Sequence, residues 1–331
     1  MFAPLASFRF PKYILPVLKL LLGLFMIAFC VRQIQWESFI ETLASVNPWF
    51  VIIGLVLTLI NMIIASLRWY LLLHALYIKA AFTRVVKLLF IGMFFNIFLP
   101  GGFAGDIVRS IQAQHEGSSF EDAISSVFTD RLLGLFGLVF FAVIGLVFQW
   151  NSLRASGLLR YFLIPSAFVC IFPIFFYNRR VMKKFQVFTT YFGLVGQKME
   201  ELYRSFYKYR HRSLPVAVVF GITLFNHLIM FASIYAFALS LDAQVSFVYF
   251  MLFLPIIGIL SMVPVTIGGL GLREFGFVFL FPLVGMTKAQ ALGSSLFFFM
   301  ALISIAFIGG FLYLYETLTG LMTLERLEKK I

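Results

Sequence analysis

The stretch FFNIFLPGGFAGDIVR, residues 94–109, begins as an apolar run suited to a bilayer and then breaks at Pro100-Gly101-Gly102. Proline removes a helix hydrogen bond, and glycine tolerates unusual backbone angles. In lipid, the freed backbone groups must be satisfied by protein or by a water-lined cavity. Asp106 and Arg109 follow directly, so this break is a candidate site. A kinked helix whose next segment is capped by Asp106 is the structural alternative.

The composition places the protein in a membrane. The chain has 331 residues, of which 62% are hydrophobic and 12% charged, whereas soluble domains are about half apolar and about a quarter charged. We therefore expect an all-α, polytopic membrane protein with one transmembrane domain over residues 1–331. No metal-ligand spacing, nucleophile triad or nucleotide loop is present, so we expect no enzyme activity, no metal and no cofactor.

A spanning helix needs about 20 apolar residues, and we expect six full spans. They cover residues 13–31, 49–67, 132–153, 161–178, 213–241 and 289–315. Two further apolar segments are broken and are expected to form re-entrant helical hairpins. The first covers residues 88–115, and the second covers residues 247–287 with breaks at Pro264 and at Gly268-Gly269-Leu270-Gly271.

The positive charge follows the apolar runs. The net charge is +12, and Lys and Arg concentrate between the spans, as the positive-inside rule describes. We expect a multi-pass protein of the inner (cytoplasmic) membrane with both termini in the cytoplasm. The basic loop 178–212, with its interleaved aromatic residues, is expected to lie on anionic lipid and not to bind nucleic acid.

With this orientation, each half of the chain contains two spans, a broken hairpin and a further span. The halves, about 13–153 and 161–315, begin on opposite sides of the membrane. This pattern predicts an inverted repeat, a recurrent design of transporters in which broken elements meet at the repeat interface.

Charged groups at membrane depth cost roughly 2.5–3.5 kcal/mol on insertion scales and often mark function. Asp106 and Arg109 can pair at i and i+3, whereas adjacent charged residues are expected to need separate partners. Internal ion pairs are one interpretation of these charges; phosphate binding by arginine is the other. Asn96 is a polar candidate inside a span, for substrate contact or for interhelical bonding. The charged candidates are Arg68, Asp106, Arg109, Asp130, Arg131, Arg273 and Glu274.

Four ordered motifs carry a family resemblance: SLRW at 66–69, the stretch 94–109, DRLLGL at 130–135 and VPVTIGGLGLRE at 263–274. The chain resembles the lysylphosphatidylglycerol synthase transmembrane family, also called the flippase-like domain family. The resemblance implies a stand-alone member, without the synthase domain, that moves a lipid between leaflets. The partners it implies are an anionic or aminoacylated phospholipid, a hopanoid or a polyprenol-linked lipid.

Together these features predict a lipid flippase in which the arginines contact phosphate. Asp106, Asp130 and Glu274 would hold the arginines or bind a cationic head group, and the hairpin glycines would let the site open to either side. Two alternatives stay open: a small-solute or ion-coupled transporter, and an accessory membrane subunit in glycolipid or hopanoid assembly. The sequence specifies neither the lipid nor the oligomeric state.

Overall fold

The computed structural model of the protein describes most of the chain outside residues 149–208. The described residues are 21–23, 25–26, 28–30, 32–33, 36–99, 104–114, 119–148, 209, 212–262, 269 and 271–319. They contain helices and no strand, which confirms the all-α membrane fold.

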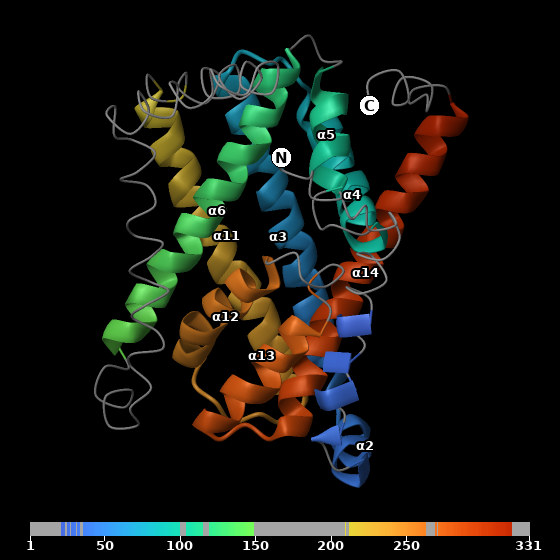
Figure 1. The fold of residues 1–331 in the computed structure, drawn as a ribbon, viewed down its shortest axis with the longest axis vertical. Helices are drawn as coiled ribbons and strands as arrows, with labels where there is room; N and C mark the ends of the chain where they lie inside the picture. Colours follow the sequence, from blue (N-terminus) through green and yellow to red (C-terminus); the bar gives the residue numbers. More distant parts are fainter. Residues whose placement is uncertain are drawn as a thin grey trace, which may run out of the picture.

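Nine α-helices and one 3-10 helix have defined bounds within the described residues (Figure 1). They are α2 (Trp36–Ala44), α3 (Pro48–Ala75), α4 (Phe82–Phe98), α5 (Ala104–Gln114), α6 (Phe120–Phe148), α11 (Ser213–Ser240), α12 (Phe247–Met262), α13 (Leu272–Leu280), η3 (Phe281–Val284) and α14 (Lys288–Leu318).

Four of these helices are long and apolar enough to cross a membrane: α3, α6, α11 and α14. They correspond to four of the six predicted spans. The predicted span 13–31 is described only in part, and the span 161–178 and most of the basic loop 178–212 lie outside the described residues. The count of six spans therefore stays a prediction.

Two helix boundaries differ from the prediction, with consequences for the charges. The span expected to open at residue 132 begins at Phe120, and the span expected to end at residue 67 continues to Ala75. Ser119 Oγ accepts a hydrogen bond from the Asp122 amide at 3.1 Å, and acidic residues in the first turn favour a helix N-terminus there. Arg68, Asp130 and Arg131 consequently lie inside long helices and not at their ends.

Each broken segment forms two helices, α4 with α5 and α12 with α13, and Figure 1 shows α5 and α13 toward opposite ends of the molecule. The breaks at Pro100, Gly101, Gly102, Pro264 and Gly268 lie outside the described residues. Gly269 and Gly271 have positive φ angles of 75° and 87°, which favour glycine. The expected interruption before α13 is therefore present in the backbone.

The two arms of the first hairpin touch through their backbones. A Cβ added at Gly105 would overlap the carbonyl oxygen of Gly92. Asn96 Oδ1 also accepts a hydrogen bond from the Gly105 amide at 2.9 Å, which satisfies one of the free donors at the start of α5. Asn96, a candidate for head-group contact, thus holds the hairpin together.

One turn conformation occurs in both halves of the chain. After α3, Tyr77 has φ 63°, and after α11, Asp242 has φ 55°. The following amides of Ile78 and Ala243 close the same turn, onto the carbonyl oxygens of Leu73 and Ala238. Two such turns support the predicted halves, although the inverted repeat itself stays a prediction.

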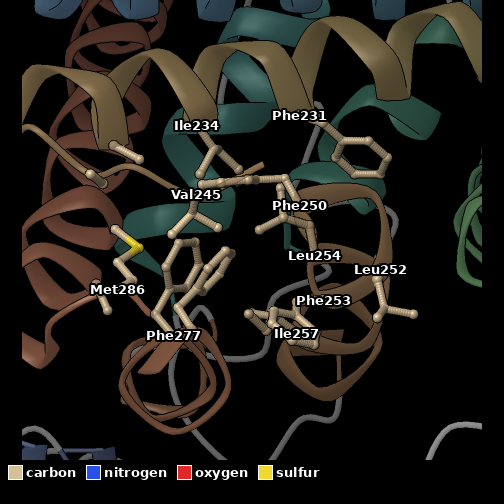
Figure 2. Close-up of a cluster of buried hydrophobic side chains, with 14 of the residues drawn as sticks. Phe231, Ile234, Val245, Phe250, Leu252, Phe253, Leu254, Ile257, Phe277 and Met286 are labelled. Carbon is tan, nitrogen blue, oxygen red and sulfur yellow. The ribbon is translucent and has the colours of Figure 1, made fainter. Parts of the chain in front are cut away.

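The helix contacts cross between the halves. The first hairpin packs through α4 on α14, while α12 of the second hairpin packs on α6; α3 and α11 form the most extensive pair. A large apolar core lies under α11, where Figure 2 shows Phe231 and Ile234 pointing from α11 toward Phe250 and its neighbours. This core packs α6 of the first half against α11, α12 and α13 of the second.

Candidate functional site

Five of the seven charged candidates meet where α3, α5 and α6 converge. Arg68 Nε donates to Asp130 Oδ1 at 2.6 Å. Arg109 Nη2 lies 3.2 Å from Asp106 Oδ1 and 3.5 Å from Asp130 Oδ2. Arg131 binds Asp106 through two hydrogen bonds of 2.9 Å. We call these five residues the arginine cluster: Arg68, Asp106, Arg109, Asp130 and Arg131.

The pairings inside the arginine cluster follow from helix geometry. Asp106 and Arg109 pair at i and i+3, as expected. The neighbours Asp130 and Arg131 have different partners, Asp130 on the Arg68 side and Arg131 on the Asp106 side. Two aspartates therefore join three helices through three arginines.

The arginine cluster has one more positive than negative charge. Four of its members are buried, whereas the Arg131 side chain is 41% exposed. Within the described part of the chain, Arg109 Nε is buried without a hydrogen-bond partner. Buried polar groups nearly always have partners, so an unpaired arginine N–H in a net-positive cluster is suited to an additional anionic acceptor.

Trp69 shapes the apolar wall of the cluster. It is fully buried, and the Arg109 guanidinium lies 5.0 Å from its ring centroid. The indole N–H donates to Ser126 Oγ at 3.0 Å. The bond to Ser126 thus positions the Trp69 ring for a cation–π contact with Arg109. The sequence motif at 66–69 thus supplies Arg68 to the arginine cluster and the Trp69 ring that lies against Arg109.

The end of the basic loop packs against the same part of α3. Tyr209 is buried, and its hydroxyl donates to the Leu72 carbonyl oxygen at 3.0 Å. Burial, followed by the charges of Asp122 and Asp130, raises the pKa of Tyr209 well above its ordinary value. Its hydroxyl therefore keeps its proton and remains a donor.

The other two candidates form a separate site. Arg273 Nε and Nη2 donate to Glu274 Oε1 at 3.0 Å and 2.5 Å, and Ser295 Oγ of α14 lies 3.2 Å from that oxygen. Glu274 Oε2 accepts from the Gly271 amide at 2.7 Å. The prediction that Arg273 and Glu274 need separate partners was wrong, because the long arginine side chain folds back onto the neighbouring carboxylate at the helix start.

The described contacts do not join Arg273 and Glu274 to the arginine cluster. The Arg273 guanidinium lies against Phe299 at 4.7 Å, beside Ser295. Figure 1 places α13 toward the opposite end of the molecule from α5. The predicted contact of all four arginines with one head group stays a prediction.

Two polar features in the spans connect helices. His227 Nε2 lies 2.8 Å from the Gly134 carbonyl oxygen, and Asn61 Nδ2 donates to the Asn226 carbonyl oxygen at 2.8 Å. Sequence reasoning missed a further ion-pair group among the described residues, in which Glu316 meets Arg84 and Lys87. The sequence feature that could have predicted this group is an acidic residue in the last turn of a span, where the helix dipole disfavours it.

Comparison with protein-family models shows the family to which this chain belongs. The family model described as the lysylphosphatidylglycerol synthase TM region matches residues 17–310. The chain belongs to this family. The match covers the arginine cluster, both hairpins and α3, α6 and α11 in full, so the predicted resemblance is confirmed.

Three relatives are similar to this chain, two of them over most of their own length. A UPF0104 membrane protein of Pyrococcus horikoshii is 24% identical over 85% of this chain and 89% of its own. One from Methanocaldococcus jannaschii is 24% identical over 76% and 80%. A relative in Methanothermobacter thermautotrophicus is 31% identical over 33% of this chain and 30% of its own. These names describe membrane proteins and assign no activity.

Proposed function

We propose that this protein moves a polar lipid between the leaflets of a membrane and that the arginine cluster binds the phosphate of the head group. The observation that carries the proposal is the buried, unpartnered Arg109 Nε in a cluster of three arginines and two aspartates. The family membership supports the same function.

The chemistry of the cluster fits a phosphate ester. A guanidinium presents planar N–H groups that match phosphate oxygens, and charge-assisted hydrogen bonds are about twice as strong as neutral ones. Arg131, the most exposed member, would meet the phosphate first. Arg109, held against Trp69, would then supply its free N–H. Acyl chains would remain in lipid while the head group occupies the cluster.

Asp106 and Asp130 would act as positioning residues. Each carboxylate contacts two arginines, so the guanidinium groups are held apart and oriented before a ligand arrives. Such preorganisation lowers the entropy cost of binding. The Arg273–Glu274 pair would serve a second stage of the same movement, from the other hairpin.

The test uses purified protein in liposomes with fluorescent phosphatidylglycerol as the probe. The label in the outer leaflet is reduced chemically, and the protected fraction reports movement. We expect the wild type to move the probe and Arg109→Lys, which keeps the charge but removes the Nε donor, to be slowed about tenfold, roughly 1.4 kcal/mol. Exposed Arg32 offers a matched control, because Arg32→Lys changes an arginine outside the cluster.

Two results would overturn the proposal: equal movement in empty and protein-containing liposomes, or equal rates for the wild type and Arg109→Lys. A trapped small solute serves as a second probe. Solute flux without lipid movement would support a small-solute transporter instead. Equal movement of a label without phosphate would reject the phosphate assignment.

A further inference from the structure

The short helix α2 has an apolar face that the rest of the described protein leaves uncovered. Trp36, Ile40 and Leu43 follow one another at i, i+4 and i+7, which is the spacing of one helix face. These residues are 58%, 62% and 40% exposed. The opposite face carries Glu37 and Glu41, which are also exposed. Exposed apolar patches bordered by polar residues mark sites of interaction with a protein or a membrane.

Phe39 attaches α2 to the second hairpin and to α14. Its side chain packs against the small cluster of Cys30, Val278 of α13 and Leu292 of α14. The Phe39 ring also meets the Trp36 ring edge-on, with 6.2 Å between the centroids. One side of α2 is therefore held by protein, and its place relative to the membrane helices is defined.

The ends of three membrane helices lie close to α2. The Asn47 amide, just before α3, donates to the Ser240 carbonyl oxygen at the end of α11, at 2.9 Å. Gln290, in the first turn of α14, donates from its side chain to the Leu241 carbonyl oxygen at 3.0 Å. Since α3, α11 and α14 all qualify as spans, these contacts mark one surface of the membrane. Only residues 45–47 separate α2 from α3, so α2 lies at that surface, at the same end of the molecule as α13 (Figure 1).

The length and charge of α2 disfavour other surroundings for its apolar face. Nine residues are too few to cross a bilayer, because a spanning helix needs about 20. In water the apolar face would stay uncovered, whereas tryptophan favours the membrane–water interface. A second copy packed face to face would bring Glu37 and Glu41 toward the same two acids, and like charges repel. The bilayer interface accepts both faces, with the apolar one in lipid and the acids in water.

We propose that α2 is an interfacial anchor, lying in the plane of the membrane with Trp36, Ile40 and Leu43 inserted among lipid head groups and upper acyl chains. The helix contains no lysine or arginine, so its attachment depends on apolar burial, and a neutral lipid surface is sufficient. The basic loop 178–212 differs, because its predicted partner is anionic lipid. This inference goes beyond the proposed function, since it concerns how the chain is positioned in the membrane. Through Phe39, the anchor ties α13 to that surface.

The accessibility of spin labels in phosphatidylcholine liposomes tests the anchor. The native cysteines are replaced by alanine, and a single labelled cysteine is placed at Ile40 or at Glu41, both of which are exposed. Oxygen concentrates in the bilayer and a polar nickel chelate stays in water, so the ratio of their collision rates reports the surroundings of the label. We expect this ratio to be several-fold higher at Ile40 than at Glu41. It should approach the ratio at Ile53, an exposed residue of the span α3.

Changes at Trp36 and in the lipid sharpen this test. Trp36→Glu, combined with the label at Ile40, should lower the ratio toward the Glu41 value, because it places a charge on the inserted face. Trp36→Phe is the matched control, since it keeps an apolar ring, and it should leave the ratio high. Adding phosphatidylglycerol to the liposomes should leave the ratio at Ile40 unchanged. Equal ratios at Ile40 and Glu41 would overturn the proposal, and so would insertion that requires phosphatidylglycerol.

A second copy on the apolar face would give a different signal. Low collision rates with both reagents at Ile40, together with spin–spin broadening, would show that copy and overturn the anchor. Lipid movement in the same liposomes is measured independently. A protein that moves no lipid but has the high ratio at Ile40 keeps the anchor and loses the proposed function. A protein that moves lipid with equal ratios at Ile40 and Glu41 keeps the proposed function and loses the anchor.

Discussion

Asn61 Nδ2 donates to Asn226 Oδ1 at 3.0 Å, and these two residues are 165 positions apart in the chain. Tyr77 and Asp242, the two positive-φ residues, have the same separation, as do the first residues of α3 and α11. Asn61 and Asn226 would therefore be matching positions if the predicted halves form an inverted repeat, and they bind each other. Such a contact lies where a two-fold axis would pass between α3 and α11.

The asparagine pair predicts coupled effects on stability. Asn61→Ala and Asn226→Ala should each lower the free energy of unfolding, and the double variant should lose less than their sum. Interhelical hydrogen bonds in membranes give coupling energies of about 0.6 kcal/mol, with about 1.7 as an upper value. Unfolding in detergent would be followed by tryptophan fluorescence. Asn61→Ala with exposed Ser304→Ala serves as the additive control.

Gly105→Ala should destabilise the first hairpin. The new methyl group would overlap the Gly92 carbonyl oxygen, which is backbone and has little freedom to move away. We expect a loss of about 1–3 kcal/mol. Gly221→Ala is the matched control, because nothing lies within 4 Å of a Cβ there. It should be neutral or stabilise by about 0.5–1 kcal/mol. Equal melting temperatures for both variants would contradict the close approach.

Asp130→Ala should be among the most destabilising changes in the chain. It leaves Arg68 without its 2.6 Å partner and removes one of two carboxylates from Arg109. Removing one partner of a buried ion pair costs about 3–5 kcal/mol. The exposed Asp242→Asn keeps a residue that tolerates positive φ and should change stability little. Thermal unfolding measures both, and comparable losses would reject the assigned pairing.

Tyr209→Phe should lower stability by about 1 kcal/mol through the lost bond to Leu72. It should also change the alkaline pH dependence. Because burial raises the pKa of Tyr209 above 10.0, the unfolded chain releases this proton first, and stability falls as pH rises past 10.0. The variant lacks that contribution, so its deficit should shrink at high pH. Tyr77→Phe, at an exposed tyrosine, is the matched control variant.

Sequence reasoning located the functional segments because their signals are local. Apolar length predicted α3, α11 and α14, and Pro-Gly-Gly predicted the break between α4 and α5. The i and i+3 spacing predicted the contact of Asp106 with Arg109. Sequence reasoning placed the helix boundaries less well. The polar residues Ser119 and Glu121 indicated a loop, but they lie at the N-terminal end of α6.

By itself the sequence determined the membrane class, the family and the charges that need explanation, since these depend on composition and on motifs within a few residues. The tertiary structure decided which charge meets which. Arg68 contacts Asp130, which is 62 positions away in the chain, and Arg84 contacts Glu316, which is 232 positions away. It joined five charges in one cluster and left Arg273 with Glu274 in another. Partners so distant are set by how helices cross, which no local pattern in the chain encodes.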